Sequence, residues 1–155
     1  MLFRSGEAKS FIGIQIERNR QNRTIRLHQR KYLEEILEHF GMDSCNGLNV
    51  PLDRSIKLVP ATSEDILKGD DVTKYQSIVR KLMYGMIATR PNLAFAVSTL
   101  GRFNAAPTIA HLGAAKKTLR YLKQTLNVGI SYGPSSSNNI TGLYSNDLIG
   151  FSDSD

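Results

Sequence analysis

Two prolines constrain the fold of this chain more than any other feature, because they interrupt a long run of apolar residues at helical spacing. A proline cannot supply the backbone hydrogen bond of a helix interior, and it pushes the residue before it out of helical conformation. Pro91 therefore separates a helix predicted over residues 72–89 from one that continues to Phe103. Thr108, directly after Pro107, is a suitable N-cap for a further helix. The middle of the chain is thus predicted to be a set of packed helices.

The first of these helices has a broad apolar face that includes Met83 and Ile87. Another helix is predicted over residues 29–40, because its apolar residues share helical spacing and Gly41 suits the position after a helix end. Before it, alternating apolar and polar residues flank a polar centre at residues 19–22, which predicts a β-hairpin. Strand geometry puts alternate residues on one face, here Ile12, Ile14 and Ile16.

The end of the chain is predicted to form short strands over residues 128–132, 140–144 and 148–153. The sequence therefore indicates an α+β protein with three regions. These are an antiparallel β-hairpin at residues 1–28, a helical bundle at 29–126, and the first strands of an incomplete sheet at 127–155.

The net charge of +6 at pH 7 and the pI near 9.6 favour a polyanionic partner, nucleic acid first and an anionic membrane surface second. Six cations with no acid among them lie close together in the hairpin region, and a second basic cluster lies on the last predicted helix. Either cluster alone is about as consistent with a solvated surface as with phosphate binding, whereas the two together favour nucleic acid. The clusters are Arg18, Arg20, Arg23, Arg26, Arg30 and Lys31, and Lys116, Lys117, Arg120 and Lys123.

Several other kinds of site are disfavoured by the sequence. Cys45 is the single cysteine, which argues against a disulfide framework or a thiolate metal cluster and favours a reducing compartment, the cytoplasm or the nucleus. No phosphate-binding glycine loop or nucleophile elbow occurs, and no apolar run is long enough to cross a membrane. Asp153 and Asp155 alternate along the last predicted strand and have the spacing of half a divalent-metal site.

Five stretches of the chain resemble, in order and approximate spacing, segments of copia-type retrotransposon polyproteins. They are FIGIQIERN, LHQRKYLEEILEHFGM, YQSIVRKLMYGMIATRPNLAFAVSTLGRF, HLGAAKKTLRYLKQT and LIGFSDSD, of which LMY with TRPNLAFAV, RYLK-T and GFSDSD are the most specific. The resemblance implies the last part of a reverse transcriptase joined to the start of ribonuclease H. Residues 1–28 would then be the end of the palm, residues 29–126 a thumb-like region, and residues 127–155 a truncated ribonuclease H-like start.

The resemblance also implies roles for individual residues. Asp153 matches the first metal-binding aspartate of ribonuclease H, so it is the candidate catalytic and metal-binding residue; Mg²⁺ is implied for the complete enzyme and no cofactor for this chain alone. Arg80 lies in a segment similar to the thumb helix along the primer-template duplex. Its long side chain would block a close backbone approach to nucleic acid or would instead reach a phosphate, and Arg80 is a candidate nucleic-acid-binding residue on the second alternative. The family often has glycine at Arg80, tryptophan at Leu112, aspartate at Asn92 and serine at Gly101.

We therefore expect a truncated piece of a retrotransposon RNA-directed DNA polymerase. The Tyr-x-Asp-Asp turn that holds the polymerase aspartates of such proteins is absent from the sequence, and two-metal hydrolysis needs more carboxylates than the chain ends with, so no catalysis is expected from this chain alone. Its expected partners are an RNA–DNA or DNA duplex, the missing upstream palm and fingers, and the downstream ribonuclease H portion, with no membrane. The alternative is a non-catalytic protein-interaction module derived from a retroelement.

Overall fold

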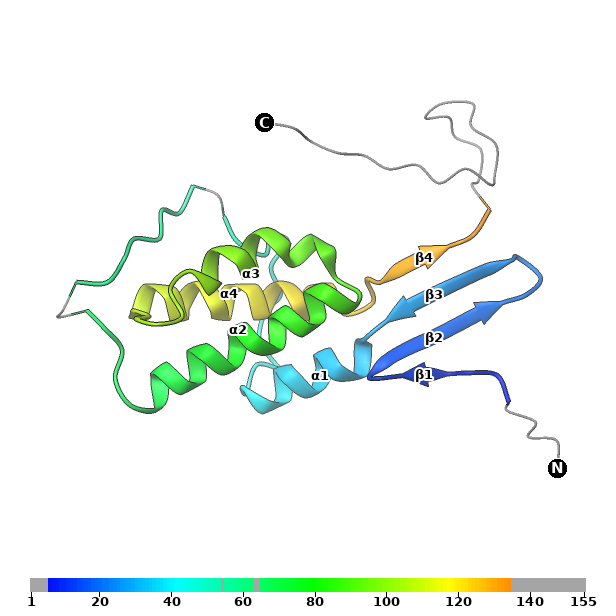
Figure 1. Ribbon diagram of the computed structural model, residues 1–155, viewed down its shortest axis with the longest axis horizontal. Helices are drawn as coiled ribbons and strands as arrows, with labels where there is room; N and C mark the ends of the chain where they lie inside the picture. Colours follow the sequence, from blue (N-terminus) through cyan, green and yellow to red (C-terminus); the bar gives the residue numbers. More distant parts are fainter. Residues whose placement is uncertain (1–5, 54, 63–64, 135–155) are drawn as a thin grey trace.

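A small antiparallel sheet stands at one end of a bundle of helices in the computed structural model, which describes residues 6–53, 55–62 and 65–134 (Figure 1). The sheet has the strand order β1-β2-β3-β4. In the bundle, α2 packs against α3 and α4, and α1 packs against α4. The elements are β1 (Ser10–Phe11), β2 (Ile14–Asn19), β3 (Thr24–His28), α1 (Arg30–His39), α2 (Asp70–Ala88), the 3₁₀ turn η1 (Pro91–Leu93), α3 (Ala94–Gly101), α4 (Ile109–Gln124) and β4 (Ile130–Tyr132).

The predicted hairpin is confirmed as β2 and β3. Its register places Glu17 opposite Arg26 and Asn19 opposite Thr24. Within the turn, the Asn19 side-chain oxygen accepts a hydrogen bond from the Asn22 backbone N–H at 2.9 Å, a common way for asparagine to stabilise a turn.

The strand predicted at residues 128–132 is present as β4, and it pairs antiparallel with β3 rather than standing apart from the hairpin. Leu27 pairs with Ile130, so the sheet joins the first predicted region to the beginning of the third. The strands predicted at residues 140–144 and 148–153 lie outside the described residues. The thumb-like and ribonuclease H-like assignments stay predictions.

The prediction that Ile12 shares a face with Ile14 and Ile16 is wrong. The chain turns at Ile12 and Gly13, whose φ angles are 46° and 71°, and β1 folds back so that Phe11 pairs with Ile14. The Tyr84 hydroxyl of α2 donates a hydrogen bond to the Ile12 carbonyl, so a tertiary contact accompanies the turn. Glycine adopts positive φ without strain, whereas a β-branched residue there is an outlier. The Ile12 side chain is left 68% exposed.

The predicted helices are confirmed, and their buried faces form one core. Pro91 stands at the start of η1, which leads directly into α3, as the sequence indicates. The side chains at the centre of the core have no measurable exposure, and they include Leu33, Tyr75, Ile78, Leu82, Leu93, Leu100, Leu119 and Leu122. The apolar face predicted for α2 is narrower than expected, because Met83 and Ile87 lie at the surface with 42% and 73% exposure.

Arg90, between α2 and η1, is fully buried and binds the end of α4. Its guanidinium donates to the Thr125 carbonyl at 2.9 Å, to the Thr125 hydroxyl at 2.6 Å and to the Asn92 side-chain oxygen at 3.2 Å. No carboxylate lies within ion-pair distance of Arg90 among the described residues. Burial lowers the pKa of Arg90, and the nearby Tyr121 opposes this shift. The carbonyls that end a helix carry partial negative charge, so α4 supplies part of the stabilisation that a carboxylate would give.

Asn92→Asp is expected to raise the free energy of unfolding by about 0.5–1 kcal/mol at pH 7, because a charged acceptor binds a guanidinium more strongly than a neutral amide oxygen. Asn92 also donates to the Tyr121 hydroxyl at 2.6 Å, and that hydroxyl can instead donate to an aspartate. Urea denaturation measures the change. Asn104→Asp, which changes the net charge equally, is the control, and an equal rise in both variants would contradict the explanation.

His111 is expected to make stability depend on pH. Its ring stacks on Phe103, with centroids 4.0 Å apart, and its Nδ1 accepts the Thr108 backbone N–H at 2.9 Å. Burial lowers the pKa of His111 below its ordinary value of 6.5, although a hydrogen bond to the Val59 backbone opposes the shift. The unfolded chain therefore binds a proton near pH 6.5 where the folded protein does not, so the free energy of unfolding should fall as pH is lowered from about 7.5 to 5.5.

Urea denaturation across this pH range tests the role of His111. His111→Gln keeps an acceptor for the Thr108 N–H at the third helical position and should flatten the dependence. His39→Gln removes an exposed histidine and should leave the dependence unchanged. An unchanged slope in His111→Gln would show that another group is responsible.

Candidate nucleic-acid interface

Three of the predicted arginines line one hollow at the tip of the hairpin. Arg18, Arg20 and Arg23 surround a space of about 330 Å³ together with Asn19, Thr24 and Ile25. Arg23 adopts a left-handed backbone conformation with φ 53°, and its N–H donates to the Arg20 carbonyl at 3.3 Å. The turn therefore brings cations from both sides of the hairpin tip to the same place. Guanidinium groups around a hollow suit the recognition of phosphate oxygens.

No acidic residue lies within the basic stretch of the hairpin sequence, but two glutamates from outside it contact its arginines in the folded structure. Glu7 forms an ion pair with Arg20 at 3.2 Å, and Glu17 forms one with Arg26 at 3.1 Å. The side chains of Arg20 and Glu7 are 73% and 49% exposed, and exposed pairs of this kind contribute little, so a phosphate can replace Glu7. Hydrogen bonds from His28 and then from Arg26 hold the pKa of Glu17 below its ordinary value of 4.5.

Arg26 and Arg30 bind the segment that leads into β4. Arg26 donates to the Asn127 backbone carbonyl as well as to Glu17. Arg30 donates to the Asn127 side-chain oxygen at 3.1 Å and to Glu34, four residues later in α1, at 2.8 Å. These contacts hold β4 beside β3. The structure thus separates arginines at the hairpin tip from arginines that connect the sheet.

Three basic residues of α4 form a stripe along one side of the helix, and one of them, Arg120, is held by a hydrogen bond to another segment. Lys116, Arg120 and Lys123 recur at intervals of four and three residues, which places them on the same side of the helix. Arg120 donates to the Asn46 carbonyl at 2.7 Å, so it connects α4 to the segment after α1. Lys117 lies off this stripe. Hydrogen bonds from the backbone and side chain of Ser55, and to a smaller extent the charge of Lys117, hold the pKa of Asp53 below its ordinary value.

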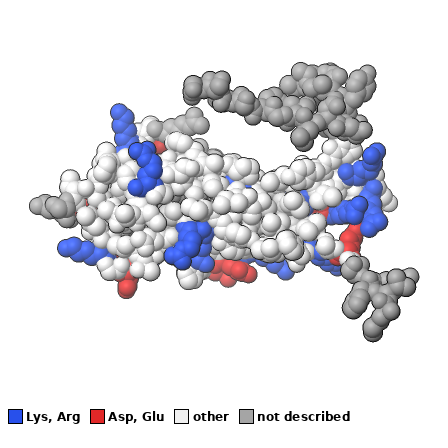
Figure 2. Space-filling model, viewed as in Figure 1, with Lys and Arg blue, Asp and Glu red and all other residues white. Residues whose placement is uncertain are grey.

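The two predicted basic clusters do not form one continuous band on the face shown in Figure 2. Lysine and arginine side chains gather there over the hairpin, with acidic side chains among them, and stand apart from each other over the helices. Arg80 is exposed on α2 and has no ion pair among the described residues. The hairpin tip is therefore the strongest candidate for phosphate binding, and α4 and Arg80 offer separate positive positions.

Asp153, the candidate catalytic and metal-binding residue, lies outside the described residues, as does Asp155. Within the described part of the chain, no group of three or more histidine, cysteine, aspartate or glutamate side chains could hold a metal ion. The same residues contain no helix with the length and apolar character needed to span a bilayer.

Two features of the surface and interior were missed by reasoning from the sequence. The first is the buried Arg90, for which the signal was a charged residue between Thr89 and Pro91 in an otherwise apolar stretch. The second is an exposed apolar surface where the turn after β1 meets α2. Phe11 is 66% exposed beside Ile12, and Tyr84 holds this turn close to the exposed side of α2.

Comparison with known proteins gives relatives but no fold assignment. The chain is 38% identical over 135 residues to the retrovirus-related Pol polyprotein from transposon TNT 1-94 of Nicotiana tabacum, a match that covers 84% of this chain and 10% of that protein. It is 36% identical over 124 residues to the corresponding polyprotein from transposon RE1 of Arabidopsis thaliana, covering 80% of this chain and 8% of that protein. No family model matches, and no solved structure matches.

A shorter relative is an uncharacterized mitochondrial protein of Arabidopsis thaliana, 31% identical over 145 residues, with 94% of this chain and 58% of that protein covered. The chain therefore spans about a tenth of the Pol polyproteins and somewhat more than half of the mitochondrial protein. The matches agree with the resemblance seen in the sequence motifs. The chain is homologous over most of its length to copia-type retrotransposon Pol polyproteins and corresponds to one segment of them.

Proposed function

We propose that this chain is the segment of a retrotransposon reverse transcriptase in which the palm ends, the thumb follows and ribonuclease H begins. By itself it binds primer-template nucleic acid. The order of the motifs along the chain and the similarity to Pol polyproteins support this proposal. We expect the isolated chain to show no polymerisation on a primed template, because the polymerase turn is absent from the sequence. We also expect no cleavage of a hybrid strand with Mg²⁺, because two-metal hydrolysis needs more carboxylates than Asp153 and Asp155 provide. Metal-dependent turnover that disappears in Asp153→Asn would contradict this expectation.

The hollow lined by Arg18, Arg20 and Arg23 is the observation on which the binding proposal rests. Contacts from these side chains to phosphates release counterions, so affinity falls as salt rises. Phosphates are the same in every sequence, so little sequence preference follows. Arg26 is the fourth predicted hairpin arginine, and its contacts with Glu17 and Asn127 give it a structural task that the three tip arginines lack.

A protein-interaction module is the second candidate, and the exposed apolar surface favours it. Tyr84 binds the turn at Ile12, next to the exposed Phe11, and Met83 and Ile87 are exposed on the same helix as Tyr84. Exposed apolar side chains that form a contiguous patch are typical of surfaces that bind other proteins. In this reading, the face that contacts the rest of the polyprotein in a full-length relative binds a different protein.

Replacing Arg18, Arg20 and Arg23 together by alanine should reduce the salt dependence of binding to an RNA–DNA hybrid. The slope of log affinity against log salt concentration should become shallower by about two to three contacts, because each arginine neutralises about one phosphate. Fluorescence anisotropy with a labelled hybrid at several salt concentrations measures this slope. Affinity for hybrids of different sequence should be similar in both proteins.

Two controls test whether the change in slope comes from the position of the arginines at the hairpin tip rather than from the loss of charge alone or from a loss of stability. The first control replaces three lysines away from the hairpin by alanine, namely Lys57, Lys68 and Lys74, and so removes the same amount of charge. The salt slope should then change by less than the equivalent of one phosphate contact. Arg26→Ala should lower the free energy of unfolding by about 1 kcal/mol with little effect on the slope, since it removes hydrogen bonds that hold β4. Equal slopes in both triple variants, or no binding at low salt by a folded chain, would favour the protein-interaction reading.

A further inference from the structure

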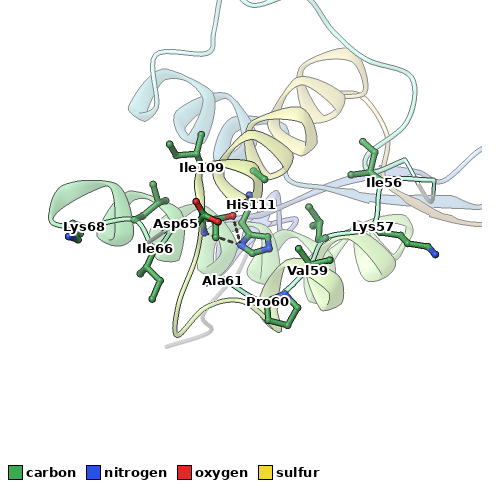
Figure 3. A pocket seen from close by; sticks show the side chains of 14 residues that line it. Ile56, Lys57, Val59, Pro60, Ala61, Asp65, Ile66, Lys68, Ile109 and His111 are labelled. Atoms are coloured by element: carbon green, nitrogen blue, oxygen red, sulfur yellow. Dashed lines mark hydrogen bonds between the residues drawn. The ribbon is translucent and has the colours of Figure 1, made fainter. Parts of the chain in front are cut away.

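A groove lies at the beginning of α4, between two segments of the long connection from α1 to α2. Its volume is about 640 Å³, and its walls are residues 56–61 and 65–68 together with the first turn of α4 (Figure 3). Apolar side chains provide most of the lining, among them Ile56, Val59, Ile66 and Ile109. The groove uses none of the residues assigned to nucleic-acid binding.

Both walls of the groove are attached to the helical bundle. On one side, Ile66 forms an antiparallel bridge with Thr108, and the Leu67 N–H donates to the Pro107 carbonyl at 2.8 Å. On the other side, the Val59 backbone is hydrogen bonded to the buried ring of His111. The space between the walls is therefore formed without a ligand, which lowers the entropic cost of binding.

The apolar surface of the groove continues onto its rim. Ile109 is 76% exposed and Val59 is 65% exposed, although both are large aliphatic side chains. A small molecule inside the groove would leave these rim positions in water. A chain segment lying along the groove would cover both the floor and the rim, so the exposure favours a protein partner over a small ligand.

The charges around the groove specify the partner further. Lys57 and Lys68 stand at opposite ends and point away from each other in Figure 3. Asp65 also lines the groove, and its carboxylate accepts a hydrogen bond from the Thr62 hydroxyl at 2.8 Å within its own turn. A partner segment with acidic residues on both sides of an apolar centre would place a carboxylate near each lysine.

We propose that this groove binds an extended segment of another protein that has an apolar centre and acidic flanks. The groove is at the N-terminal end of α4, whereas β4 and the hairpin lie beyond its C-terminal end. A helix of 16 residues spans about 24 Å, so the groove and the arginine hollow can be occupied at the same time.

The test uses the whole chain and a fluorescein-labelled synthetic peptide whose centre is Leu-Ile-Phe-Leu, with two aspartates on each side. Fluorescence anisotropy should show saturable binding that weakens by about tenfold or more in Ile109→Asp, because a charge replaces an apolar contact at the rim. Aspartate is favourable in the first turn of a helix, so this variant should remain folded. Phe95→Asp is the matched control, since Phe95 is 47% exposed in the first turn of α3 and does not line the groove, and this variant should bind the peptide as the unchanged protein does.

A charge reversal tests the acidic flanks separately. The double variant Lys57→Glu with Lys68→Glu should bind the aspartate-flanked peptide more weakly and should prefer a peptide with lysines in place of the aspartates. The proposal is overturned if the folded chain binds no peptide up to about 1 mM, or if Ile109→Asp and Phe95→Asp have equal effects. Binding of decanoate without binding of the peptide would assign the groove to small molecules, and self-association that Ile109→Asp abolishes would assign it to a second copy of the chain; either result contradicts the proposal.

Discussion

The arrangement of this protein depends on one buried cation. Arg90 connects the turn between α2 and η1 to the last residues of α4, and it does so with neutral acceptors and the partial charge of a helix end. Burying an arginine without a carboxylate is costly unless its donors are satisfied. Because Thr125 receives two of these hydrogen bonds, Arg90 fixes where α4 ends. The Thr125 carbonyl also accepts the Val128 N–H at 3.0 Å, which directs the chain toward β4.

The same corner of the molecule connects the bundle to the sheet. Thr89, the neighbour of Arg90, donates its hydroxyl hydrogen bond to the buried Gln29 side chain at 2.9 Å, directly between β3 and α1. The buried Gln29 amide nitrogen has no partner among the described residues, so one hydrogen-bond donor at this junction is left without an acceptor there. Arg26 and Arg30 bind Asn127, which lies between α4 and β4. The hairpin that carries the candidate phosphate site is thus positioned by polar contacts rather than by the apolar core.

Local signals in the sequence were enough to predict the helices and the hairpin. Pro91 and Thr108 set helix boundaries through backbone chemistry that acts within a few residues, and the alternation around residues 19–22 does the same for the hairpin. Ile12 could not be predicted from alternation, because its turn is accompanied by a hydrogen bond from Tyr84, far away in sequence. The exposure of Met83 and Ile87 likewise depends on which side of α2 receives α3 and α4.

For the candidate phosphate site, the sequence predicted which residues take part better than it predicted how they are arranged. The arginines of the hairpin were recognisable as a cluster, but the acids that approach them, Glu7 and Glu17, lie outside the basic stretch or across the strand pair. The groove beside α4 had no sequence signal, because residues 53–69 lack any periodicity and their walls depend on contacts with Thr108 and His111. Long connections of this kind acquire shape only from the elements that they cross.

The pairing of β3 with β4 has a consequence for the order in which the chain folds. The hairpin is local and can form early, whereas β4 follows the entire helical bundle in sequence, and its pairing must wait for that bundle to close the intervening loop. Until then β3 is an open edge, and open edges invite pairing with other chains. Arg26 lies in the middle of that edge, and a charged side chain there disfavours pairing with other chains. An arginine that holds the finished sheet together therefore also protects it during synthesis.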